Sequence, residues 1–371
     1  MMVAICCIFL TKLFCFFKQL IILFLLSYSY FVFVYVFCLK SLFKTKQDPS
    51  YLSSNLSVNL IFSYLFSFNL NFLFTICFYL LILFKPHARA HKKYSLDKKL
   101  LKQMSLDNHE SEDENHEIKL DSIQNSHLKI LAQNRNLTLK TRNNYGHIRI
   151  CLKCNIIMPD RCSHCKSCKT CILKRDHHCP WLSKCIGYSN QKYYICMLTY
   201  LAFLIVFVLT TLFGRIIDVL AFVRNNFNEG VNLIFILNVD QRTDVIHISA
   251  LYMLCCLLFF PICLLLINTY CLALSNLTNI EHNFPPFVVE SREFEEEQQR
   301  TNSANVLGNL KEIFGSSSLL AYMPVWTTPG DGHSFSFNFK PIEKRKCICN
   351  CVWDCRITFY FLIRLILICF K

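Results

Sequence analysis

Residues 151–185 read CLKCNIIMPDRCSHCKSCKTCILKRDHHCPWLSKC, and this stretch decides how the chain is organised. It contains eight cysteines and three histidines. Both residue types are ligands of structural zinc, and a pair spaced Cys-x2-Cys lets a tight turn present two thiolates to one ion. Cys151 and Cys154 form one such pair, and Cys165 and Cys168 form another. The spacing therefore predicts a zinc-binding module.

Each of the two pairs needs two further ligands to complete a tetrahedral site. If Cys162 and Cys179 are excluded, the available ligands are His164, Cys171, Cys185 and one of His177 and His178. Six cysteines and two histidines then make two sites of three cysteines and one histidine. The stretch has more ligands than two zinc ions can use, which leaves a thiol for chemistry.

The spare residues lie in the tetrad Asp176-His177-His178-Cys179. If the tetrad is extended, alternate side chains face the same side, so His177 lies beside Cys179 and His178 points away toward zinc. An imidazole base raises the reactivity of a neighbouring thiol, and a carboxylate can orient that imidazole. The alternative is a plain zinc module in which Cys179 is a spare or exchange ligand.

The rest of the chain predicts a membrane protein. Of its 371 residues, 53% are hydrophobic, 34 are Phe and only 8 are Gly, which is too apolar for an ordinary soluble protein. A membrane-spanning helix needs about 20 apolar residues. The segments that qualify, or nearly so, are 19–38, 58–84, 194–213 and 248–273. We predict an α-helical integral membrane protein with four transmembrane helices and a two-zinc domain between the second and third.

The other parts of the chain follow from these spans. They are an N-terminal interfacial segment 1–18, a charged linker 85–148, the zinc and catalytic domain 149–193, an external loop 214–247, a C-terminal region 274–346 and a cysteine-rich apolar tail 347–371. The tail either lies on the membrane or, less readily, binds metal or lipid through its cysteines. We find no internal repeat.

The net charge of +14 comes from basic residues that flank apolar runs. A membrane surface or an anionic co-substrate explains them better than nucleic acid, for which the chain has no motif. Basic residues are more frequent in 85–192 than in 214–247, so the positive-inside rule places the cysteine-rich stretch and both termini in the cytosol. Eight of the 23 cysteines lie in this stretch at zinc-like spacing, whereas a secreted disulfide scaffold would be short and soluble, so we also expect a reducing compartment.

The tetrad, set in a cysteine-rich domain between the second and third of four spans, resembles the DHHC protein S-acyltransferases (palmitoyltransferases). The similarity also includes 147–151, 159–161, 185–187, Asn190 and the Gly308-Asn309-x-x-x-Ile313-Phe314-Gly315 motif. It implies that Cys179 takes an acyl group from a long-chain acyl-CoA such as palmitoyl-CoA. The acyl group then passes to cysteines of membrane-associated proteins, at the Golgi, the endoplasmic reticulum or the plasma membrane.

The resemblance also implies the roles of the other site residues. His177 is the base and Asp176 orients it. One structural zinc takes Cys151, Cys154, His164 and Cys171, and the other takes Cys165, Cys168, His178 and Cys185. Lys174 and Arg175 are candidates for pairing with coenzyme A phosphates, although basic residues at a membrane face are usually interfacial.

Two positions depart from the family pattern. The usual Thr-Thr-x-Glu after the fourth span is here Thr278-Asn279-Ile280-Glu281, and the usual Asp-Pro-Gly turn is Lys85-Pro86-His87. An asparagine side chain still donates and accepts hydrogen bonds, so we expect a shifted contact near Asp176 and a slower enzyme, but not an inactive one.

Three readings compete. The first is the acyltransferase, with an acyl tunnel lined by Tyr200, Phe203, Leu204 and Phe207, a stripe that ordinary helix packing would also explain. The second is a non-catalytic, zinc-stabilised membrane scaffold or trafficking chaperone. The third, a membrane RING-type ubiquitin ligase, fits the ligand spacing poorly and leaves the tetrad unexplained. A scaffold needs neither an orienting acid nor a spare thiol, so the intact tetrad favours the acyltransferase.

Overall fold

A computed structural model describes residues 2–44, 58–103, 120–143, 145–228, 239–283, 287–288 and 306–335. The predicted tail 347–371 lies outside the described residues. The chain divides into two compact units. The helical unit comprises Met1–Leu80, Pro180–Leu182 and Ile195–Ile267, and the zinc unit comprises Leu81–Cys179, Ser183–Tyr194 and Asn268–Lys371.

The long helices follow the apolar runs of the sequence. They are α1 (Met2–Tyr30), which continues through the π-helical η1 (Phe31–Leu39) into α2 (Lys40–Lys44), then α3 (Val58–Phe84), α6 (Gln191–Asn228) and α8 (Val239–Leu274). Within the described ranges, four spans are long and apolar enough to cross a membrane: Phe16–Phe43, Val58–Phe84, Gln191–Asn225 and Asp240–Leu274. The predicted fold class, four spans with a cysteine-rich cluster between the second and third, is confirmed.

The helices extend beyond the predicted spans. Helix α1 runs without a break through the predicted interfacial segment 1–18. Helix α6 continues past residue 213, and α8 begins at Val239, so much of the predicted loop 214–247 is helical. The reason is that Arg215 and Asp218 end the uninterrupted apolar run without ending the helix, because both residues tolerate helical backbone.

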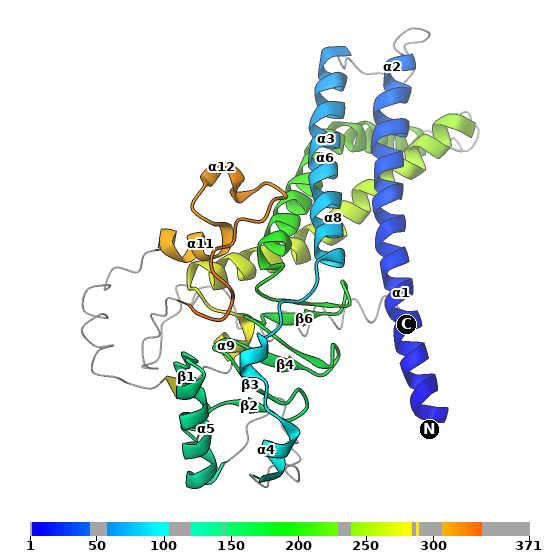
Figure 1. The fold of residues 1–371 in the computed structure, drawn as a ribbon. Helices are drawn as coiled ribbons and strands as arrows, with labels where there is room; N and C mark the ends of the chain where they lie inside the picture. Colours follow the sequence, from blue (N-terminus) through cyan, green and yellow to red (C-terminus); the bar gives the residue numbers. More distant parts are fainter. Residues whose placement is uncertain are drawn as a thin grey trace. The chain divides into compact units, whose positions relative to one another are not determined.

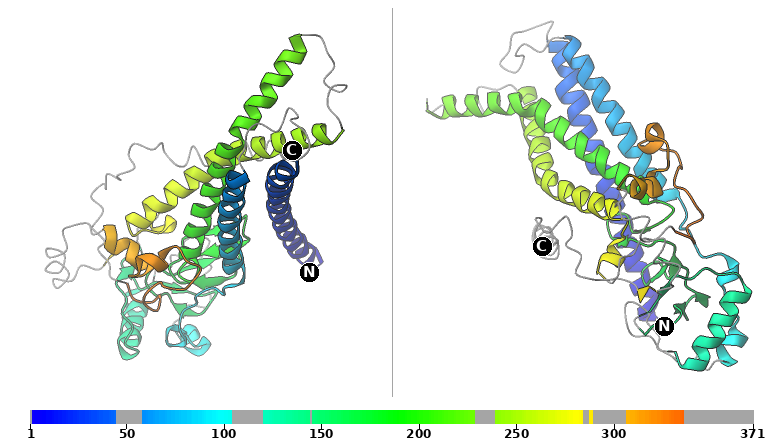
Figure 2. Two further views of the ribbon diagram at one scale, coloured as in Figure 1. Left: turned by 90° about the horizontal axis from the view of Figure 1, so that it is seen from above. Right: turned by 90° about the vertical axis from the view of Figure 1, so that its left-hand side faces the viewer.

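Helices α1 and α3 run side by side (Figures 1 and 2), and aromatic side chains pack α1 and η1 against α3. The ring of Phe33 stacks on that of Phe68, with centroids 4.3 Å apart, and both side chains are fully buried. Tyr30 contacts Phe72, and its hydroxyl donates to Asn69 Oδ1 at 3.0 Å. These contacts extend into a core that includes Leu204 and other residues of α6 and α8.

Three short antiparallel hairpins follow one another in the zinc unit (Figure 1). They pair β2 (Ile150–Cys151) with β3 (Ile156–Ile157), β4 (Ser163–Cys165) with β5 (Thr170–Ile172), and β6 (His177–Cys179) with β7 (Lys184–Ile186). The loops end at Asn155, Lys169 and Ser183, each in the left-handed region with φ between 51° and 52°. Strands this short bury little apolar surface, so bound metal is the expected source of their stability.

Further elements surround the hairpins. They are η2 (Lys92–Tyr94), α4 (Lys98–Gln103), α5 (Ser122–Asn134), β1 (Thr141–Arg142) paired with β8 (Phe287–Val288), α9 (Asn279–Asn283), α11 (Val306–Phe314) and α12 (Ser318–Ala321). Helix α5 begins at a capping box in which Asp121 and Gln124 satisfy each other's backbone N–H groups. Its buried face contributes Leu128 to a core that includes Tyr94 and Ile148.

Candidate catalytic and metal centre

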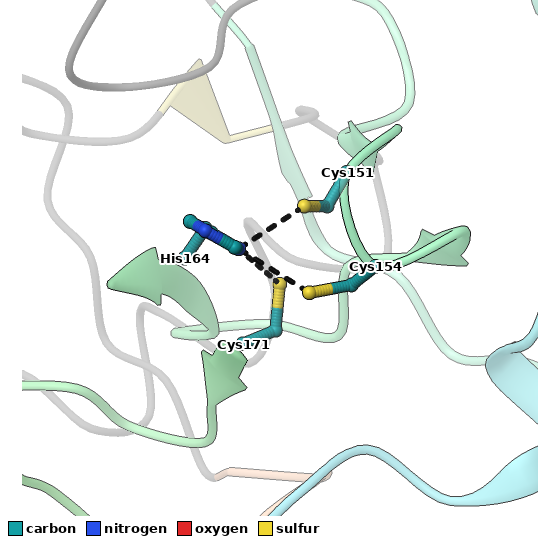
Figure 3. Close-up of side chains that lie close together, drawn as sticks. All are labelled: Cys151, Cys154, His164 and Cys171. Carbon is teal, nitrogen blue, oxygen red and sulfur yellow. Dashed lines mark hydrogen bonds between the residues drawn. The ribbon is translucent and has the colours of Figure 1, made fainter. Parts of the chain in front are cut away.

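Two clusters of cysteine and histidine lie in the described part of the chain, and the ligand atoms within each lie within 4.8 Å of one another. The first contains Cys151, Cys154, His164 and Cys171 (Figure 3). Nδ1 of His164 lies 3.5, 3.2 and 3.8 Å from the sulfur atoms of these three cysteines, in chain order. The sulfur atoms converge on the ring, as a single ion requires.

The second cluster contains Cys165, Cys168, His178 and Cys185. Nδ1 of His178 lies 3.6, 3.4 and 3.6 Å from the three sulfur atoms. The two groupings are the ligand sets that the family resemblance implied.

Strand register explains why the two sets interleave along the sequence. His164 lies directly opposite Cys171 in the β4–β5 hairpin, and His178 lies opposite Cys185 in β6–β7. Successive side chains of a strand point to opposite faces, so the neighbours His164 and Cys165 serve different clusters.

Three thiolates and one imidazole suit tetrahedral zinc. Two Zn²⁺ ions would therefore fit, one in each cluster, with all four positions filled by protein. A saturated site leaves no position for a metal-bound water, so zinc bound here would supply folding stability.

The candidate catalytic residues lie at β6, outside both clusters. Nδ1 of His177 lies 2.7 Å from Oδ2 of Asp176. Cys179 lies two residues further along the same strand and is 6% exposed. Burial lowers the pKa of His177, but hydrogen bonds with Asp176 and Cys179 outweigh burial and raise the pKa to about 9. The arrangement joins an acid, an imidazole and a thiol in one chain of contacts.

The carboxylate of Asp176 is held from a second side. Its Oδ1 accepts a 2.7 Å hydrogen bond from the backbone N–H of Asn279. That residue begins α9, where Thr278 and Glu281 form reciprocal side-chain and backbone hydrogen bonds of 3.2 and 2.9 Å. Such a capping box fixes the direction of a helix start, and here it aims an N–H group at Asp176.

A buried ion pair fixes α9 in turn. Arg161 donates to both carboxylate oxygens of Glu281, from Nε at 2.8 Å and from Nη2 at 2.7 Å. It also donates to the side chain and the backbone of Asn276, at 3.0 Å each. Burial raises the pKa of Glu281, but the charge and hydrogen bonds of Arg161 hold it below its usual value. Sequence reasoning noted Arg161 only as part of the resemblance.

Sequence reasoning also missed Tyr194, in the first turn of α6. Its ring packs edge-on against the imidazole of His177, with centroids 5.4 Å apart. No local motif marks this residue, because the contact depends on where α6 begins relative to β6.

Asn190 fixes the connection from β7 to α6. Its Oδ1 accepts from the backbone N–H of Gly187 at 2.9 Å, and its Nδ2 donates to the carbonyl of Cys185 at 3.0 Å. A side chain at Gly187 would place a Cβ 2.9 Å from the backbone oxygen of Leu173, so glycine is required there.

The predicted coenzyme A contacts lie close to these groups. Lys174 is only 2% exposed, and burial, with a contribution from Arg161, lowers its pKa to about 7. Arg175 donates from Nε to Ser163 Oγ at 2.7 Å. A role in binding coenzyme A stays a prediction for both. Cys162 is fully buried in an apolar cluster with Cys151 and Cys171.

The predicted tunnel stripe lies in the helical unit. Tyr200 stacks on Phe74 with ring centroids 4.9 Å apart, and Leu204 is buried in the core. Phe207 packs against the same core, whereas Phe203 is 61% exposed. The four side chains therefore have different surroundings, and a shared acyl tunnel stays a prediction.

Comparison with known proteins agrees with this geometry. The family model for DHHC palmitoyltransferases matches residues 144–284. The chain is similar to Palmitoyltransferase ZDHHC15 of Homo sapiens, at 28% identity over 323 residues that cover 85% of this chain and 80% of the relative. It is also similar to Palmitoyltransferase ZDHHC15A of Danio rerio, at 31% identity over 220 residues covering 59% and 61%. Palmitoyltransferase ZDHHC2 of Mus musculus matches at 29% identity over 201 residues covering 54% and 50%.

The matched range 144–284 contains both metal clusters, the tetrad from Asp176 to Cys179 and the Glu281 that supports it. A cysteine outside two complete metal clusters, paired with an oriented imidazole, is the feature that a zinc module alone does not require. With the tetrad, the clusters and the four membrane-capable helices together, residues 144–284 of this chain form a DHHC palmitoyltransferase domain.

Proposed function

We propose that this protein transfers a long-chain acyl group from acyl-CoA to cysteines of membrane-associated proteins, by way of a thioester on Cys179. The observation that carries the proposal is the contact of Asp176 with His177, on the strand that also carries Cys179. Neither His177 nor Cys179 belongs to a metal cluster. Both are therefore available for the reaction.

In the first step the sulfur of Cys179 attacks the thioester carbonyl carbon of acyl-CoA. Asp176 engages Nδ1 of His177, and Nε2 takes the proton of the Cys179 thiol before the attack, which gives an imidazolium–thiolate pair in keeping with the raised pKa of His177. A new carbon–sulfur bond forms, the bond to the coenzyme A sulfur breaks, and coenzyme A leaves as a thiolate that takes the proton from His177. The products are an acylated Cys179 and free coenzyme A.

In the second step a cysteine of the protein substrate attacks the same carbonyl carbon. His177 accepts the proton of the incoming thiol, and the sulfur of Cys179 leaves as a thiolate that recovers this proton. One thioester replaces another in each step, so no oxidant or reductant is needed. The kinetics follow a two-step, ping-pong scheme.

The acyl chain requires an apolar environment. Burial of roughly fourteen methylenes at about 0.8 kcal/mol each would hold the donor strongly. The spans supply apolar surface, and we propose that the chain of the donor lies among them. The basic excess in 85–192 supports a cytosolic catalytic domain with both termini in the cytosol. Location in the Golgi, the endoplasmic reticulum or the plasma membrane belongs to the same proposal.

The test is labelling of the purified protein with a long-chain acyl-CoA analogue, followed by hydroxylamine, which cleaves thioesters. Wild type is expected to carry a hydroxylamine-sensitive label that Cys179→Ser lacks. In Cys179→Ser the label must be absent while the zinc content equals that of wild type. Zinc-loaded wild type that takes no label would contradict the proposal. It would favour the non-catalytic membrane scaffold, which the intact tetrad otherwise disfavours.

A further inference from the structure

Residues 318–326, here called the apolar segment, lie after α11 and contain α12. Six of their side chains are apolar or aromatic and exposed: Leu319, Leu320, Tyr322, Met323, Val325 and Trp326. Leu319 is the most exposed, at 84%. The surrounding sequence 313–330 has no Asp, Glu, Lys or Arg. An exposed apolar patch of this kind marks an interaction surface.

The apolar segment is fixed to the start of the third span. Lys192, the second residue of α6, is fully buried, and its ammonium donates to the carbonyls of Leu320 and Val325 at 2.8 and 2.9 Å. It also donates to Thr327 Oγ1 at 2.6 Å. Hydrogen bonds from a charged group are stronger than neutral ones, so Lys192 holds both ends of the segment.

The same segment is fixed to the ends of two other spans. The ammonium of Lys85, which directly follows α3, lies 3.6 Å from the ring centroid of Trp326. The hydroxyl of Tyr322 lies 3.1 Å from that of Tyr270, in the last two turns of α8. The three anchors therefore stand where the second, third and fourth spans meet the catalytic domain.

Span ends define the level of the membrane surface. The apolar run of α3 ends at Phe84, which is 80% exposed, and the charged Lys85 comes next. Leu274, the last residue of α8, is also exposed. Lipid covers such residues at the end of a span, and the contacts of Lys85 with Trp326 and of Tyr270 with Tyr322 attach the apolar segment to these span ends. Trp and Tyr prefer that boundary, because their rings are apolar and their N–H and O–H groups are polar.

From these contacts we propose that the apolar segment inserts between lipid headgroups on the membrane face that carries the catalytic domain. Its partner is the phospholipid bilayer. Leu319, Met323 and Val325 contact the acyl chains, while Trp326 lies at the boundary between acyl chains and headgroups. The segment takes no part in the transfer reaction, so the proposal stands or falls separately from the proposed function.

The experiment uses the full chain in nanodiscs that contain one phosphatidylcholine. The photoreactive p-benzoylphenylalanine is placed at position 319. After illumination, the masses of the adducts are measured by mass spectrometry. A mass increase of one phospholipid is expected at this position. The matched control is position 123 on α5, where Ile123 is 67% exposed in the same unit but has the exposed polar neighbours Ser126 and His127. Position 319 should give at least about tenfold more lipid adduct than position 123.

Equal lipid adduct at both positions, or none at position 319, would overturn the proposal. So would a product of twice the chain mass at position 319, because a second copy would then cover the segment. Acyl-enzyme formation on Cys179 is measured for each variant as a check that it is folded. This check is independent of whether lipid adducts form. If the variant at position 319 does not fold, Trp326 serves instead, in a protein carrying Trp181→Phe and Trp353→Phe. Brominated acyl chains should quench its fluorescence, and unchanged fluorescence would overturn the proposal.

Discussion

The backbone N–H of Asn279 lies 2.7 Å from Oδ1 of Asp176, and Oδ2 of the same carboxylate lies 2.7 Å from Nδ1 of His177. The family usually has a threonine at the position of Asn279. The contact to Asp176 uses the main chain, so it does not depend on which side chain stands there. The side chain of Asn279 turns to Asn283 instead. The departure from the family pattern therefore leaves the orientation of Asp176 intact.

We expect Asn279→Ala and Asn279→Pro to behave differently. The alanine variant keeps the N–H group and should retain acyl transfer within about twofold of wild type. Proline is tolerated at the first position of a helix, which Asn279 occupies, but it removes the N–H group. Loss of a hydrogen bond to a charged group costs about 1.5–3 kcal/mol, so we expect a 10- to 100-fold slower transfer. Single-turnover rates of acyl-enzyme formation check this. Equal rates in the two variants would show that the N–H group is unimportant.

Cys179→Ser and Cys165→Ser should separate chemistry from folding. The first variant removes the proposed nucleophile and should take no acyl label while it keeps two zinc ions per chain. The second removes a ligand from one cluster and should lose zinc and the folded zinc unit. Metal analysis and near-ultraviolet circular dichroism of both variants provide the measurement. Equal zinc loss in the two would refute this division of roles.

His177→Ala should slow acyl-enzyme formation by about 10²–10⁴-fold, the range for loss of a general base. Asp176→Asn should also slow it, since a neutral amide no longer stabilises the imidazolium that forms in the reaction. His177→Ala should keep its zinc, because Nδ1 of His178 is the imidazole atom of that cluster. Rates at saturating acyl-CoA give the effect on chemistry, and full activity of either variant would remove that residue from the mechanism.

The Arg161–Glu281 pair makes the zinc unit sensitive to acid. The pKa of Glu281 is lower in the folded protein than its usual value, so its stabilising contribution is complete above about pH 4.5. The contribution is lost as the pH falls through the folded-state value. Glu281→Gln leaves Arg161 buried without a counter-charge and should destabilise the protein by about 3–5 kcal/mol at neutral pH.

The difference in melting temperature between wild type and Glu281→Gln should therefore narrow as the pH falls below about 4.5. Comparison of the two proteins at each pH cancels the effect of acid on the metal ligands, which both share. A difference that stays constant down to pH 3 or so would show that Glu281 is not ionised in the folded protein.

Lys192→Met should release the apolar segment. Methionine preserves the length of the buried side chain but leaves the carbonyls of Leu320 and Val325 without their donor. We expect a loss of more than about 1.5 kcal/mol in the stability of the segment. Limited proteolysis should then cut at 318–326 faster than in wild type. Lys311→Met, an exposed lysine on neighbouring α11, is the matched control and should be cut like wild type.

The sequence predicts much of the fold because two strong patterns coincide. Long apolar runs predict the four spans, and ligand spacing predicts the metal module. Alternation along Asp176–Cys179 also predicts that His177 and His178 face opposite sides, and the strand β6 has His178 but not His177 in a metal cluster. The ligand sets match because cross-strand neighbours such as His178 and Cys185 are fixed by hairpin register.

The parts that the sequence does not predict depend on distant contacts. Arg161 and Glu281 are 120 residues apart and pair only in the folded unit. Tyr194 meets His177 because α6 starts beside β6, and no local pattern encodes that contact. Likewise, Lys192 resembles an ordinary interfacial lysine until the C-terminal region folds around its ammonium. The helices also extend beyond the predicted spans, since Arg215 interrupts the apolar run but not the helix.

His178 and Cys179 are joined by a single peptide bond on a strand of three residues. A metal ligand and the proposed nucleophile therefore cannot move independently. A newly made chain that has inserted its helices but not yet acquired zinc has no rigid support for its reactive sulfur. Maturation of the enzyme would then depend on metal supply as well as on membrane insertion, and zinc scarcity would reduce protein acylation.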